Sequence, residues 1–404
     1  MAESALSRPR PTTESQLIQL LILKGPVHRA EIARHLGLSR SRVSSVVSSL
    51  LAQDIVEETQ NAGEAYGKVD GRSGPAITMA ARLGAVGGVQ ITTTNLHVAV
   101  VSLSGDVLAE DRQGLLPGLS PSEILSAARS VLDRSTAAAG IERLAIAGVG
   151  VFGQIDRVSG VVSTHPASSW WQVNAAELAI EALDVPAVVE NNSRLEALAE
   201  ASWGAGQQFD PVLYLQLGHG MTASLIVSGE VIRGAGGGAG ELAHLSIDFD
   251  GRICPCGGRG CLQQYASAEA VHLAVRERVG GSWSDVMLAL EAGDRAVHRA
   301  FQDAAEILGR AIAGLANLLD PARIVIGGEL VRAGESFVGR IADCYQDYAL
   351  PGSAGADLVV GRYQGLGRGG ALAAALLARR HLAGQVLDLV LPTEQQTHSP
   401  ESES

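Results

Sequence analysis

The segment AEIARHLGLSRSRVSSVVSSLLAQDIV, residues 30–56, contains the most specific local pattern in the first hundred residues of the chain. Apolar residues recur at helical spacing on both sides of positions 37–38 (Gly-Leu), which predicts two helices joined by a tight turn. The first helix covers residues 29–36, and the second follows Ser39 as its N-cap and runs to about Ala52. This pattern predicts a helix-turn-helix.

The flanking sequence extends this unit. Residues 16–24 (QLIQLLILK) predict an apolar helix before it. Residues 55–59 and 76–80 predict two short strands after it, joined by the Gly-rich loop 61–75. Three helices followed by a hairpin make a winged helix-turn-helix domain, which we expect over residues 15–82.

Polar side chains remain on the outer face of the second predicted helix, near its start. A recognition helix contacts base edges with this part, and arginine can bind guanine through two hydrogen bonds. In the loop, basic residues between glycines could reach a phosphate or a narrow minor groove. The expected DNA contacts are Arg40, Ser41, Arg42, Ser45, Lys68 and Arg72. The competing interpretation is a small helical subdomain with a solvated basic face.

The charge distribution agrees with a DNA-binding end on an acidic body. Residues 1–80 hold nine Lys/Arg and eight Asp/Glu, a net of +1, so the rest of this chain of net charge −12 carries −13. We find no uncharged apolar run of about 18 residues that would span a membrane. The first residues also lack an apolar signal-peptide core, so we expect a cytoplasmic protein.

From about residue 83 the sequence alternates between strand and helix patterns, with a strand predicted at residues 144–151, among others, and helices at residues 121–139, 193–203, 268–279, 294–319 and 369–378. Strand-rich segments begin near residues 86 and 212, which indicates two similar α/β lobes. We therefore expect a second domain over residues 83–390. The Pro-, Ser- and Thr-rich residues 1–14 and the polar residues 391–404 are expected to be disordered.

The segment GELAHLSIDFDGRICPCGGRGCLQQYAS, residues 240–267, combines one histidine with three closely spaced cysteines. Four nitrogen and sulfur ligands complete a closed tetrahedral zinc site, and the glycines between the cysteines permit a tight loop. A reducible disulfide or simply buried thiols are the alternatives. The predicted Zn2+ ligands are His244, Cys254, Cys256 and Cys261.

These features together resemble the ROK family, which contains repressors, uncharacterised reading frames and sugar kinases. The resemblance covers residues 15–385. Besides the winged helix, it rests on GVGVFGQID (148–156), VENN (189–192), LGHG (217–220), GAGGGAGELAH (234–244), CPCGGRGCLQQ (254–264) and LDPARIVIGGEL (319–330). It implies an actin-like, ribonuclease-H-like sugar-kinase fold whose two α/β lobes flank a sugar-binding cleft. The family's sugar contacts fall on Asn191, Asn192, Glu241, His244 and Gln263.

The sequence departs from the family's kinases where their chemistry lies. Gln90 stands where the kinases have the aspartate of their first phosphate loop, and residues 218–222 (GHGMT) replace a glycine-rich second loop. Asn192 stands where an acidic residue would deprotonate the sugar hydroxyl, and an amide is no base near neutral pH. In the sugar site, Gln263 replaces a glutamate and Phe152 a common proline. We therefore predict an inactive kinase domain.

Three functions remain open. The first is a sequence-specific repressor gated by a sugar or amino sugar in the non-catalytic cleft. It would bind an inverted-repeat operator in double-stranded DNA as a homodimer or tetramer, because one recognition helix reads too few base pairs. The second is a DNA-binding regulator with a vestigial cleft, and the third is an active ATP-dependent sugar kinase. Repression is the expected role, and activation stays open as an alternative.

Overall fold

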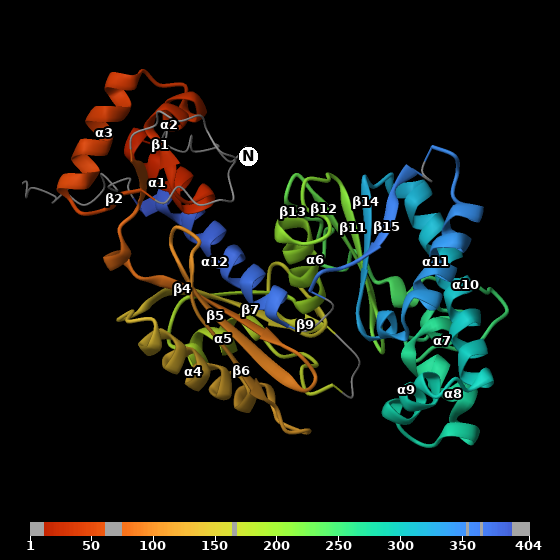
Figure 1. Ribbon diagram of the computed structural model, residues 1–404. Helices are drawn as coiled ribbons and strands as arrows, with labels where there is room; N and C mark the ends of the chain where they lie inside the picture. The colour runs from red at the N-terminus through yellow and green to blue at the C-terminus, as the bar shows by residue number, and fades with distance from the viewer. Residues whose placement is uncertain (1–11, 61–74, 164–167, 353–354, 364–366, 390–404) are drawn as a thin grey trace, which may run out of the picture.

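The computed structural model describes residues 12–60, 75–163, 168–352, 355–363 and 367–389. Two five-stranded sheets, each with its own helices, stand side by side, and a small helical unit lies at one end of the first (Figure 1). Among the described residues, no helix has the length and apolar content to cross a membrane.

The N-terminal unit has three helices and an antiparallel sheet in the order β1-β3-β2, of which β1 is additional to the two predicted strands. After α2, Gly37 adopts a left-handed conformation at φ 65°, and the Ser39 hydroxyl caps α3, as the sequence predicts. The loop containing Lys68 and Arg72 lies outside the described residues. The elements are α1 Thr13–Lys24, β1 Val27–His28, α2 Arg29–Leu36, α3 Arg40–Ala52, β2 Val56–Thr59 and β3 Ala76–Met79.

The first helix begins earlier than the sequence pattern predicts. α1 starts at Thr13, inside the range 1–14 that we expected to be disordered. Thr12 explains the difference, because its hydroxyl accepts a hydrogen bond from the Ser15 amide at 3.1 Å and so caps the helix.

Lobe I is built on a sheet in the order β10-β7-β4-β5-β6. β4, β5 and β6 form an antiparallel meander, and β7 and β10 continue parallel to β4. α4 and α5 pack on one face over buried aliphatic side chains. The elements are η1 Ala81–Leu83, β4 Ala85–Ile91, β5 Asn95–Ser102, β6 Val107–Gly114, α4 Pro121–Ala138, β7 Leu144–Val151, β8 Gln154–Ile155, β9 Val162–Ser163, α5 Ala175–Leu183 and β10 Ala187–Asn191.

Lobe II repeats this plan in the order β13-β12-β11-β14-β15, with a meander followed by two parallel strands. The expectation of two similar α/β lobes is therefore confirmed. The elements are β11 Val212–Leu217, β12 Met221–Val227, β13 Glu230–Val231, η2 Leu242–His244, α7 Gln263–Ala266, α8 Ala268–Val279, α9 Trp283–Glu291, α10 Arg295–Leu319, β14 Arg323–Gly327, η3 Glu329–Ala333, α11 Glu335–Tyr348 and β15 Asp357–Val360.

Two helices connect the lobes: α6 (Asn192–Trp203) follows β10, and α12 (Arg368–Leu389) crosses the sheet of lobe I toward α1 (Figure 1). α12 lies so close to this sheet that a Cβ at Gly148 would be 1.9 Å from the Ala374 carbonyl oxygen. α12 is longer than the predicted helix because its later residues, such as Ala383, are buried in the core shared with α1. One hydrophobic core thus joins the N-terminal unit, lobe I and α12.

Candidate metal centre and interlobe site

Four side chains come together in the segment of lobe II that follows β13. The ligand atoms of His244, Cys254, Cys256 and Cys261 all lie within 4.8 Å of one another. Cys254 Sγ is 3.8 Å from His244 Nδ1, and Cys256 Sγ is 3.7 Å from Cys261 Sγ. Zn–S bonds of about 2.3 Å in a tetrahedron place two sulfur atoms about 3.8 Å apart, whereas a disulfide needs about 2.05 Å. The spacing and the donor types therefore fit a tetrahedral metal ion.

Glycines and polar neighbours hold this loop in shape. Gly260 has φ 67°, and a Cβ there would lie 1.7 Å from the Asp248 carbonyl oxygen, so only glycine fits. Gln263 Nε2 donates to Cys254 Sγ at 2.9 Å, and the Gly258 amide donates to Cys256 Sγ at 3.4 Å. Such donors orient thiolate ligands.

The thiols affect one another's ionisation. Burial, together with the neighbouring Cys254 and Cys256, raises the pKa of the Cys261 thiol to about 12. Burial also acts to raise the pKa of Cys254, but hydrogen bonds from the Cys256 amide and the Gln263 side chain outweigh it and lower that pKa to about 6. A cation among the sulfur atoms would stabilise all three thiolates.

The residues predicted to bind sugar fall into separate groups. Asn191 and Glu241 line one small hollow between α6 and β12, whose volume of about 10 Å³ has room for a single water molecule. His244 and Gln263 turn toward the cysteine cluster instead. Asn192 is not among the residues that line this hollow. Within the described part of the chain, the five side chains do not converge on a preformed sugar pocket.

Both asparagines are engaged in internal hydrogen bonds. Asn191 is the N-cap of α6, and its Oδ1 accepts hydrogen bonds from the amides of Ser193 and Arg194 at 2.9 and 3.2 Å. Its Nδ2 donates to the Gly153 carbonyl oxygen at 2.9 Å. Asn192 Nδ2 donates to the Ile91 carbonyl oxygen at 3.3 Å. These bonds fix the start of α6 against lobe I.

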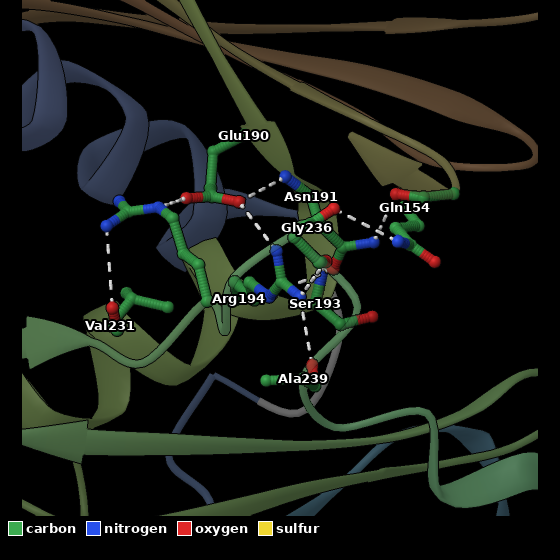
Figure 2. A network of polar contacts seen from close by, with 11 residues as sticks. Gln154, Glu190, Asn191, Ser193, Arg194, Val231, Gly236 and Ala239 are labelled. Atoms are coloured by element: carbon green, nitrogen blue, oxygen red, sulfur yellow. Dashed lines mark hydrogen bonds and ion pairs between the residues drawn. The ribbon is translucent and has the colours of Figure 1, made fainter. Parts of the chain in front are cut away.

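A buried ion-pair network beside Asn191 joins the two lobes (Figure 2). Glu190, at the end of β10, pairs with Arg194 Nη1 at 3.4 Å and with Arg233 Nε at 2.5 Å. Arg194 Nη2 donates to the carbonyl oxygens of Gly237 and Ala239 at 2.6 and 2.9 Å. The network therefore holds the glycine-rich loop of lobe II, which leads to the metal cluster, against α6.

The sequence pattern does not predict this network, although Glu190 belongs to the VENN motif. Nothing in the local pattern marks Arg194 or Arg233, because they meet Glu190 only in the folded chain. A hollow of about 450 Å³ lies beside the network and is lined by residues of lobe I, by Arg194 of α6 and, from lobe II, by Arg233.

Gln90, on β4, is buried and hydrogen-bonded within the protein. Its Nε2 donates to the Asn192 carbonyl oxygen at 3.0 Å and to Glu196 Oε1 at 3.4 Å. A Cβ at Gly370 of α12 would lie 2.3 Å from Gln90 Cδ, so this helix packs directly on the amide. An aspartate at this position could not donate these bonds and would place a second carboxylate beside Glu196.

The loop at residues 217–220 already holds a carboxylate. The His219 amide donates to Glu329 Oε1 at 2.6 Å, and the His219 ring nitrogen Nε2 lies 3.7 Å from the same oxygen. The ring packs edge-on against Trp283, with centroids 5.7 Å apart. A phosphate bound at this loop would need the same amide and would be repelled by Glu329. Glu329 was not among the predicted residues of this loop, because it lies 110 positions away in the chain.

The predicted DNA contacts on α3 share an exposed surface. The opposite face of α3 is buried against α1 and α2. No acidic residue occurs in α3, so its exposed start is basic. Arg29, by contrast, is paired with Glu58 at 2.6 Å. The predicted contacts that are exposed on α3 are Arg40, Ser41, Arg42 and Ser45.

Comparison with known proteins identifies related chains of two kinds. The ROK family model matches residues 86–381. A xylose repressor from Caldicellulosiruptor bescii is 26% identical over 82% of this chain and 88% of its own length. A glucokinase from Thermotoga maritima is 29% identical over 68% of this chain and 90% of its own length.

Among solved structures, a ROK family transcriptional regulator, a homolog of the E. coli MLC protein, has the same fold. Its TM-score is 0.72 at 24% identity, and the likeness covers 93% of this chain and 98% of that chain. This likeness, together with the repeated sheet topology, confirms the expected actin-like two-lobed fold.

Proposed function

The chain belongs to the ROK family, and we propose that it is a DNA-binding transcriptional repressor whose kinase-like lobes sense a sugar. The observation that carries this proposal is the exposed basic start of α3, on a unit that shares one hydrophobic core with lobe I and α12. A sugar kinase has no need of such a surface, whereas a recognition helix requires it.

In this proposal residues 15–82 form a winged helix-turn-helix domain and residues 83–390 form the sensor domain. The N-terminal end of α3 enters the major groove, where Arg40 and Arg42 contact base edges. A homodimer or tetramer presents two such helices to an inverted repeat. The xylose repressors among the relatives support the regulatory role.

The sensor is proposed to take D-xylose or another sugar between the lobes, near Asn191, Asn192, Glu241, His244 and Gln263. The hollow at Asn191 and Glu241 is too small for a sugar, so binding requires the lobes to move. This requirement supports gating, because a ligand shifts an equilibrium only if it binds two states unequally.

A Zn2+ ion held by His244, Cys254, Cys256 and Cys261 is proposed to stabilise the loop beside the sensor. The kinase chemistry is proposed to be absent. Gln90, Asn192 and the Glu329 carboxylate at the former phosphate loop support this part of the proposal.

A regulator with a vestigial cleft is a second candidate. It is favoured by the internal hydrogen bonds of Asn191 and Gln263, which leave these side chains little capacity for a sugar hydroxyl.

The test has two steps. Unbiased selection of genomic fragments by the full chain should first yield an inverted-repeat site, and binding without sequence preference would refute a specific repressor. D-xylose, D-glucose and N-acetylglucosamine are then added separately to that complex, and at least one of them should weaken DNA binding. If none of them, nor any sugar of a wider panel, changes the affinity, the vestigial cleft is the better description.

A further inference from the structure

Two consecutive arginines of α12 contact three different parts of the molecule. Arg379 is 7% exposed. Its Nη2 donates to the Ile22 carbonyl oxygen in α1, and its Nε donates to the Leu103 carbonyl oxygen of lobe I at 3.1 Å. Arg380 Nη1 donates to the Gly229 carbonyl oxygen of lobe II at 2.8 Å and pairs with Glu230 at 3.2 Å.

The partner of Arg379 in the N-terminal unit is a carbonyl that the helix itself cannot satisfy. Ile22 lies in the last turn of α1, where a carbonyl finds a backbone partner only if the residue four positions later, beyond the helix, supplies an amide hydrogen. That residue is Pro26, which has no amide hydrogen. A buried carbonyl without a partner is costly, so Arg379 supplies a donor that the sequence of α1 cannot.

The turn after β5 is fitted closely around this contact. A Cβ at Gly25, just after α1, would lie 2.6 Å from the Ser104 carbonyl oxygen, and a Cβ at Gly105 would lie 2.6 Å from Arg379 Nη1. The side chains of Thr78 and Ser104 are also hydrogen-bonded to each other. The N-terminal unit therefore meets lobe I and α12 at one tightly packed point.

We propose that Arg379 and Arg380 form a joint that transmits the orientation of lobe II to the N-terminal unit. This inference rests on the proposed function. It adds the contacts through which a movement of the sugar-sensing lobes would reach the N-terminal unit. The first half of α12 cannot shift on lobe I, because it lies against the glycines of β4 and β7. A movement of lobe II displaces Gly229 and Glu230 at the turn between β12 and β13. Arg380 follows this turn, and Arg379, one residue away, holds α1.

A double-mutant cycle tests the joint without sugar or DNA. Hydrogen exchange of the amides in residues 13–24 is measured in the full chain for the wild type, Arg379→Met, Arg380→Met and the double variant. Arg380→Met, although its partners lie in lobe II, should raise exchange in α1 by about threefold to tenfold. In the Arg379→Met background, the same change should have no further effect. Arg276→Met, an exposed arginine of α8, is the matched control and should leave α1 unchanged.

Two results would overturn this proposal. One is unchanged hydrogen exchange in α1 when Arg380 is replaced, and the other is an equal change in that exchange when Arg380→Met is made in the wild type and in the Arg379→Met variant. If Arg379→Met does not fold, Arg379→Lys takes its place in the cycle, because lysine keeps the charge and can still donate to one of the two carbonyls. The failure of every sugar to affect DNA binding would refute the proposed sensing, but it would leave the exchange result as it stands. The two proposals therefore fail independently.

Discussion

The side-chain amide of Gln90 donates to the carboxylate of Glu196 across 3.4 Å, and both side chains are buried at the base of α6 and α12. The backbone amides of Gly367 and Gly370, at the start of α12, also donate to Glu196. Burial, and next the nearby Glu200, nevertheless raise the pKa of Glu196 from 4.5 to about 7. A group that sits between the lobes therefore changes its charge near neutral pH.

Glu196 should make stability depend on pH. Its pKa is 4.5 in the unfolded chain and about 7 in the folded protein, so folding favours the protonated form. Its contribution to the free energy of unfolding is then complete below about pH 4.5 and is lost as the pH rises through about 7. Urea unfolding at several pH values should show that Glu196→Gln flattens this slope. Glu177→Gln, on the exposed face of α5, should leave it unchanged. Identical slopes in Glu196→Gln and the wild type would contradict the prediction.

Metal content should be one zinc per chain. The four donor atoms are within 4.8 Å of one another and fit a closed tetrahedral site. Elemental analysis of protein purified without added metal should find about one equivalent. Cys256→Ser should lose the metal and lower the unfolding temperature, whereas Cys344→Ser, at a buried thiol outside the cluster, should retain it. Metal-free wild-type protein with unchanged stability would exclude the site.

Hexoses should not be phosphorylated by ATP. Asn192 is not basic enough to deprotonate a hydroxyl, and the loss of a general base alone lowers the reaction rate by about 10²–10⁴-fold. Asn192→Asp should not restore turnover, because Gln90 and the Glu329 carboxylate at residues 217–220 remain. The measurement is a coupled assay for ADP release. Turnover above background that disappears when cleft residues are replaced would show an active kinase.

DNA affinity should depend on the exposed start of α3. Arg40→Ala or Arg42→Ala should weaken binding to the selected site by about 1–3 kcal/mol if the residue contacts a base. Arg276→Ala, an exposed arginine outside the N-terminal unit, is the control and should have little effect. Fluorescence anisotropy measures the DNA affinity of each variant and of the control. The salt concentration is kept fixed, because salt weakens every contact to phosphate. Equal losses on specific and random DNA would mean that the arginine contacts phosphate only.

Glu241 should separate sensing from DNA binding. It is exposed, lines the hollow shared with Asn191, and is not among the metal donors. Glu241→Ala should keep operator affinity in the absence of sugar but lose the response, which is about 1–3 kcal/mol in an ordinary coupled system. Titration of the protein–DNA complex with the active sugar provides the readout. A full response in Glu241→Ala would remove this residue from the sensor.

The N-terminal helices and many strands could be predicted because their signals are local. Ser39 caps α3 through its own neighbours, and strands such as Leu144–Val151 were predicted with the bounds that the structure has. The sequence pattern did not predict helices α5, α9 and α11. α12 was predicted too short, because its later residues are held by α1, which is more than 350 positions away in the chain.

The candidate sites divide in the same way. The cluster of one histidine and three cysteines could be predicted from the residues alone, because its four donors lie within one short segment whose glycines turn the loop back on itself. The exposed face of α3 could be predicted in the same way, since helical periodicity alone places the apolar residues inside. Three other contacts depend on the folded chain: Glu190 pairs with Arg194 and Arg233, Glu329 accepts from the amide of His219, and Arg379 donates to a carbonyl oxygen of α1. These partners come from different lobes or from opposite ends of the chain. Buried charges and donors must find partners wherever the packed chain brings them together, and no local pattern specifies that place.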